Sequence, residues 1–73
     1  MSVAKETIRR IQHVLARKGY NPGVIDGIWG RNTDAAVRAF QVDNGLVADG
    51  IVGATTSRAL FGDPLDAEPF NNP

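Results

Sequence analysis

A five-residue stretch occurs twice in this chain of 73 residues. "DGIWG" begins at Asp26 and "DGIVG" begins at Asp49, a constant offset of 23 positions. Extending the comparison aligns "DGIWGRNTDAAV" with "DGIVGATTSRAL", where six of twelve positions are identical and a seventh pairs Val37 with Leu60. A chain this short forms one small domain, so the repeat must organise most of it.

Each repeat is typical of a turn that begins a helix. An Asp-Gly pair favours a turn in which glycine takes positive φ, while the aspartate oxygens accept bonds from nearby amides. A glycine then stands at the expected N-cap, and a threonine three residues later is predicted to bond back to the cap, as in a capping box. The isoleucine of each repeat is predicted to anchor the turn in the core. The residues with these structural roles are Asp26, Gly27, Gly30, Thr33, Asp49, Gly50, Gly53 and Thr56.

Three segments carry helical patterns. Apolar residues recur every three or four positions over residues 4–18, and Gly19 is a natural stop. A second pattern covers residues 31–44 and ends at Gly45, and a third covers residues 54–60 and is closed by Gly62. The predicted fold class is therefore all-α, a small three-helix bundle with two duplicated Asp-Gly loops. Short β-like pairing between the loops is an open alternative, and Val24, Ile25 and Ile28 are expected to tuck under the helices.

The charge of the chain divides at residue 62. The net charge is zero, but residues 1–62 hold all eight basic residues against five acidic ones, and residues 63–73 hold three acidic residues and no basic one. The last segment also contains three of the four prolines, which disfavours helices and central strands. We predict a domain over 1–62 and an acidic, proline-containing tail or linker over 63–73. A body charge of +3 is too small for a typical nucleic-acid binder.

The residues give no support for catalysis, metal binding or membrane insertion. The chain has no cysteine, and His13 is its single histidine, predicted on a helix surface. Turn stabilisation explains Asp26 and Asp49 without acid/base chemistry, and Ser57 has no evident base partner. The apolar runs are too short to span a bilayer. The start, "MSVAKETIRR", lacks the apolar stretch of a secretory signal, so the chain either is not exported by that route or is a piece of a longer protein.

Several motifs in order resemble one known family. They are "RRIQ" with Gln12, Gly19-Tyr20, "DGIWG..T", "AVRAFQ" and "DGIVG..T", and together they cover about residues 8–60. This pattern is similar to the peptidoglycan-binding domains, three-helix modules of bacterial and phage cell-wall hydrolases. One departure is that Arg31 and Ala54 stand where the family often has proline at the first helical position.

The resemblance implies non-catalytic attachment to peptidoglycan, through the glycan strand, the stem peptide or both, in the service of a tethered amidase, transglycosylase, muramidase or peptidase. It implies no cofactor, no nucleic acid and no membrane as partner, and a location in the cell wall or periplasm, with a phage origin left open. A protein-interaction or structural module on the same scaffold is the alternative function, followed by a small helical nucleic-acid binder.

Candidate binding residues lie where the two repeats differ. Trp29 in the first repeat matches Val52 in the second, so the turn itself does not demand an aromatic ring. Trp29 is either a platform for a sugar face or a stem peptide, or a partly buried cover of the core. Arg31 and Asn32 offer donors for carboxylates and amides, or are simply solvated surface. The predicted ligand-binding residues are Trp29, Arg31, Asn32, Tyr20 and, on the exposed side of the second helix, Gln41 and Asn44.

Overall fold

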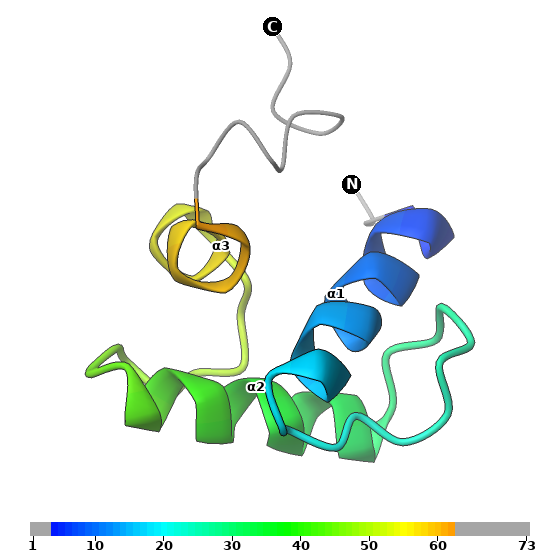
Figure 1. Cartoon of the computed structure of the whole chain (residues 1–73), viewed down its shortest axis with the longest axis horizontal. Coiled ribbons are helices and arrows are strands. Elements are labelled where there is room, and N and C mark those ends of the chain that lie inside the picture. Colours follow the sequence, from blue (N-terminus) through cyan, green and yellow to red (C-terminus); the bar gives the residue numbers. More distant parts are fainter. Residues whose placement is uncertain (1–3, 63–73) are drawn as a thin grey trace, which may run out of the picture.

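Three helices make up the described part of the chain. The computed structural model describes residues 4–62, so the predicted tail over 63–73 lies outside it. The helices are α1 (Lys5–Arg17), α2 (Arg31–Asp43) and α3 (Ala54–Phe61), each within one residue of its predicted bounds (Figure 1). Residues 4–62 contain no strand, so the β-like pairing considered for the loops does not form there. The all-α prediction is confirmed.

The core is formed where α1 meets the other two helices. α1 packs against both α2 and α3, and α2 runs crosswise below them in Figure 1. The buried aliphatic and aromatic side chains are Ile11, Val14, Leu15, Ala36, Val37, Phe40 and Leu60. Half-buried residues pack around this cluster, among them Tyr20, Trp29 and Val52. The apolar stripes of the sequence therefore face inward as their helical spacing indicates.

Glycines in the left-handed conformation end α1 and α2 in the same way. Gly19 has a φ of 94°, and the next amide, that of Tyr20, donates to the carbonyl of Leu15 at 2.8 Å. Gly45 has a φ of 70°, and the amide of Leu46 donates to the carbonyl of Gln41 at 2.8 Å. Such bonds satisfy carbonyls in the last helical turn and redirect the chain. Both helices thus release the chain directly into a repeat loop.

The helix starts differ from the prediction in one respect. Gly30 and Gly53 are the N-caps of α2 and α3, as expected, but neither helix has a side-chain hydrogen bond at its cap. The capping-box role predicted for Thr33 and Thr56 is wrong, because both threonines are buried and their hydroxyls accept bonds from glutamine side chains instead.

The apolar loop residues also lie differently from the prediction. Val24, Ile28 and Ile51 are exposed, and only Ile25 is half-buried, so the isoleucines of the repeats do not anchor their turns in the core. The physical reason is that the buried side chains of Gln12 and Gln41 fix the turns through their backbone amides. The side chains of Ile28 and Ile51 are thereby left free to face solvent.

Candidate functional site

A fully buried glutamine on α1 holds the first repeat loop. The Gln12 carbonyl oxygen accepts bonds from the backbone amides of Gly27 at 2.9 Å and Asp26 at 3.1 Å. The Gln12 amide nitrogen donates to the carbonyl of Ile28 at 3.1 Å and to the Thr33 hydroxyl at 3.0 Å, with the Asp26 carboxylate at 3.4 Å. Two donors face its oxygen and only acceptors face its nitrogen, so the orientation of the amide is determined.

A second buried glutamine repeats this arrangement on α2. The Gln41 oxygen accepts a bond from the amide of Gly50 at 3.0 Å. Its nitrogen donates to the Asp49 carboxylate at 3.1 Å, the carbonyl of Ile51 at 3.0 Å and the Thr56 hydroxyl at 3.1 Å. The prediction that Gln41 lies on the exposed side of the second helix is therefore wrong: its side chain is 0% exposed and cannot touch a ligand.

The sequence contained a signal for these glutamines that the constant offset concealed. Gln12 precedes Asp26 by 14 residues, whereas Gln41 precedes Asp49 by 8, because the first loop is longer. An alignment with a fixed offset of 23 therefore does not pair the two glutamines. Allowing a gap pairs "IQ" at Ile11 with "FQ" at Phe40 and extends the repeat backward into the preceding helix.

The aspartate of each loop is held in its ionised form. Asp26 accepts the amide of Ile28 at 2.9 Å, and Asp49 accepts the amide of Ile51 at 2.9 Å. These backbone bonds are the main cause that lowers the pKa of both carboxyls, and the bonds from the glutamines lower it further while desolvation opposes them. Both aspartates are therefore charged at neutral pH and occupied with turn formation.

A groove lies beside the first loop, at the start of α2. Its volume is about 530 Å³, and it opens to solvent. Apolar walls come from Pro22, Val24 and Ile28, and polar groups come from Arg31 and Asn32 in the first turn of α2. Such a mixture of apolar surface and a few polar groups suits a ligand that is itself partly apolar. The lining residues are Pro22, Val24, Asp26, Ile28, Gly30, Arg31, Asn32 and Thr33.

The other predicted binding residues lie away from this groove. Trp29 is half-buried against the core and does not line it. The Tyr20 hydroxyl donates to the Asp43 carboxylate at 2.6 Å, its ring meets Phe40 edge-on, and the bond to Asp43 raises the pKa of Tyr20. The Asn44 side chain donates to the carbonyl of Phe40 at 2.8 Å at the end of α2. Of the six predicted residues, the structure brings together Arg31 and Asn32.

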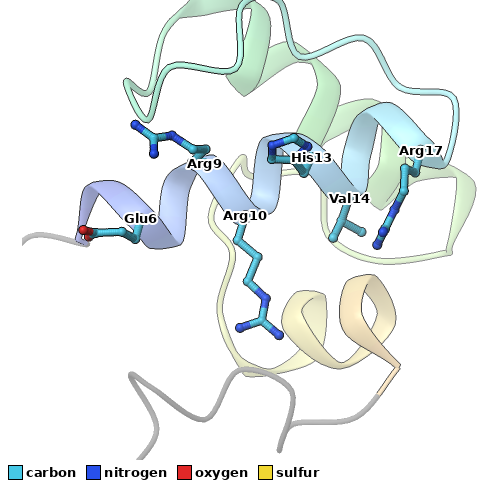
Figure 2. Close-up of a pocket in the computed structure, with 6 residues that line it drawn as sticks. All are labelled: Glu6, Arg9, Arg10, His13, Val14 and Arg17. Carbon is cyan, nitrogen blue, oxygen red and sulfur yellow. The ribbon is translucent and has the colours of Figure 1, made fainter.

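Sequence reasoning missed a second surface, along α1. Six residues of α1 line an open depression of about 370 Å³. In Figure 2, His13 lies between Arg9 and Arg17 along the helix. Arg10 extends toward α3, where its guanidinium lies 5.3 Å from the centre of the Phe61 ring. Arg9 and Arg17 form no ion pair with any residue between 4 and 62. The lining residues are Glu6, Arg9, Arg10, His13, Val14 and Arg17. Three arginines against one glutamate give this open helix face a positive charge.

Residues 4–62 contain neither a metal-binding cluster nor a membrane-spanning helix. Within residues 4–62, no cluster of three histidine, aspartate or glutamate side chains is arranged to hold a metal ion. None of the helices that the structure describes has the length and apolar character needed to cross a bilayer. Two candidate surfaces on the described residues are the groove of the first loop and the arginine-bordered face of α1.

Comparison with known proteins identifies similar sequences. The sequence model of the peptidoglycan binding domain matches residues 4–60. N-acetylmuramoyl-L-alanine amidase CwlM of Mycobacterium tuberculosis is 36% identical over 56 residues, which are 77% of this chain and 14% of the amidase. N-acetylmuramoyl-L-alanine amidase CwlL of Bacillus licheniformis is 42% identical over 59 residues, covering 73% of this chain and 16% of the amidase.

A third relative is the spore cortex-lytic enzyme of Bacillus subtilis. It is 43% identical over 57 residues, which are 77% of this chain and 19% of the enzyme. The chain thus spans less than a fifth of the length of these curated relatives. No solved structure matches it significantly.

Proposed function

Because the chain belongs to the peptidoglycan binding domain family, we propose that it binds peptidoglycan without cleaving it and holds a cell-wall-active catalytic partner at its substrate. The match over residues 4–60 carries this proposal, since it covers α1, α2, both loops and all of α3 except its last residue. The relatives are named as an amidase or a cortex-lytic enzyme, and the similar region is a small part of each. That division is expected of a binding module joined to a separate catalytic domain. The proposed place of action is the cell wall or the periplasm.

The groove of the first loop is the proposed ligand contact. Val24 and Ile28 offer exposed apolar surface for a sugar face or a peptide methyl group. The Arg31 guanidinium can donate two parallel bonds to a stem-peptide carboxylate, and the Asn32 amide can bond a peptide group. The side chain of Asn32 lies over the backbone of Gly23, where an added Cβ would be 3.0 Å from the Asn32 nitrogen, so part of its position is set by the loop.

A pull-down on purified, protein-free sacculi tests the proposal. The variant Arg31→Ala/Asn32→Thr gives the first repeat the first-turn residues of the second repeat, which are Ala54 and Thr55. We expect severalfold weaker binding to soluble muropeptides with free carboxylates. Arg58→Ala is the matched control, because Arg58 is an exposed arginine on α3 that lines neither described surface.

Two outcomes would redirect the proposal. Retention of DNA at moderate salt, with no binding to sacculi, would assign the arginines of α1 to a nucleic-acid function. Binding to neither material would favour the protein-interaction module. To test the tethering role, the chain is fused to a hydrolase domain that lacks a binding module. The fusion should digest sacculi faster than the hydrolase domain alone, with an unchanged rate on a soluble substrate.

A further inference from the structure

The two repeat loops expose matching pairs of aliphatic side chains. Val24 is 75% exposed and its counterpart Val47 is 77% exposed. Ile28 is 62% exposed and its counterpart Ile51 is 65% exposed. Each pair is separated by the same 23 positions that relate the two Asp-Gly turns. The structure thus places the same two side-chain types, at nearly the same exposure, beside both turns.

The fold does not need these side chains. Gln12 and Gln41 fix the turns through their backbone, and none of the four aliphatic residues belongs to the buried core. A single exposed valine or isoleucine on a protein surface requires no explanation. A matched pair on each of two equivalent turns does, because the first pair already lines the groove assigned to the ligand.

We propose that the chain carries a second ligand-contact site, formed by Val47 and Ile51 beside the second Asp-Gly turn, which binds a further unit of the same glycan polymer. The occupant is the apolar face of a sugar ring, which both aliphatic pairs can cover. This inference rests on the proposed function for the identity of the polymer. It adds that the duplication of the loop is a duplication of the binding site.

The two sites differ in charge. Arg31 and Asn32 follow the first turn, whereas Ala54 and Thr55 occupy the equivalent positions after the second. The first site therefore combines apolar contact with recognition of an anionic group, and its affinity should fall as salt is added. The cation beside the second turn is Arg38, which donates to the carbonyl of Ala48 and is already paired with Asp34. The affinity of the second site should therefore be lower and should depend less on salt.

The two turns meet α2 at different places. The groove of the first loop reaches Arg31 and Asn32 in the first turn of α2. The second loop folds back along α2, where Arg38 donates to the carbonyl of Ala48 at 3.2 Å and a Cβ added at Gly50 would lie 2.5 Å from the Asp34 carboxylate. Two weak contacts on one insoluble network strengthen attachment through effective concentration.

An NMR titration of the full chain with a disaccharide-peptide released from purified peptidoglycan tests the second site. We expect two sets of backbone amide shifts, one over residues 26–30 and one over 49–53, with separate dissociation constants. Ile51→Ser should remove the second set and leave the first. Ile28→Ser should do the reverse. Val42→Ser is the matched control, because Val42 is 64% exposed on α2 and lies outside both turns; it should leave both sets unchanged.

Binding to intact sacculi completes the test. The double variant Ile28→Ser/Ile51→Ser should lose more affinity than either single variant. Shifts confined to residues 26–30, with Ile51→Ser binding sacculi like the parent chain, would overturn the second site while leaving the proposed function in place. Absence of any binding to fragment or sacculus would overturn the proposed function, and the second site with it.

Discussion

Replacing Gln12 gives the sharpest test of how the first loop is held. Gln12→Met keeps the length and apolar stem of the side chain but removes its amide. The buried amide of Gly27 then loses its partner, as do the partly buried amide of Asp26 and carbonyl of Ile28. A buried polar group left unsatisfied costs about 1–3 kcal/mol, so we expect a loss of about 2–4 kcal/mol in the free energy of unfolding. In a domain of this size that lowers the thermal midpoint on the order of 10 to 30 °C.

Gln12→Glu tests the orientation of the amide. At pH 7.5 the introduced carboxylate would place an oxygen against the carbonyl of Ile28 and beside the Asp26 carboxylate, where the Gln12 nitrogen now lies. These acceptors repel it, so its pKa should be raised in the folded state. A group with a raised folded pKa is stabilising below its unfolded pKa and loses that effect as pH rises. The deficit relative to the parent chain should therefore be larger at pH 7.5 than at pH 5.

Thermal unfolding followed by circular dichroism at both pH values measures these effects. His13→Met and His13→Glu are matched controls at the adjacent, exposed position. A midpoint for Gln12→Met within a few degrees of the parent chain would refute the argument that the glutamine bonds stabilise the loop. A Gln12→Glu deficit that does not change with pH would refute the assigned amide orientation.

Three further predictions concern the loops. In urea unfolding, Gly27→Ala should lower the free energy of unfolding by more than about 1 kcal/mol, because the glycine has a positive φ. The loss should exceed that of Gly50→Ala, since a Cβ at Gly27 would also lie 2.9 Å from a backbone oxygen. The pKa values of Asp26 and Asp49 are lowered in the folded state, so the stability they contribute is present above the unfolded pKa of about 3.9 and is lost as pH falls. In acid titrations, the free energy of unfolding of the double asparagine variant should therefore decline less steeply than that of the parent chain. Trp29→Ala should lower the thermal midpoint yet bind muropeptides normally below that midpoint, because Trp29 packs against the core; the opposite result would make it a ligand contact.

The helices could be predicted from the sequence because their signals are local. The three-to-four spacing of Ile8, Ile11 and Leu15 defines one face, and glycine follows each helix. Helix existence and ends depend on such nearby residues. The positive φ of Gly27 and Gly50 followed in the same way from the Asp-Gly pairs.

The polar centre of the fold could not be predicted in this way. Gln12 lies between apolar residues on the inward face of α1, and nothing within its helix shows that its partner is an amide fourteen or fifteen positions away. A buried glutamine is stable only when every polar atom finds a partner, and those partners come from the tertiary arrangement. Without that information, the exposed character of Ile28 could not be inferred, and the hydrophobic pattern favoured burying it.

The unpredicted role of Gln12 and the wrong prediction that Ile28 is buried are connected, and the connection bears on the function. A turn anchored by its isoleucine could not use that isoleucine to contact a ligand, since the side chain would be part of the core. Gln12 takes over the anchoring through the backbone of Asp26 and Gly27, which leaves Ile28 outside the core and 62% exposed. Substitutions at Ile28 should therefore change ligand contact at little cost in stability, whereas substitutions at Gln12 should do the reverse. The same separation holds between Gln41 and Ile51, so each repeat combines a buried anchor that fixes the turn with a neighbouring surface that is free to bind.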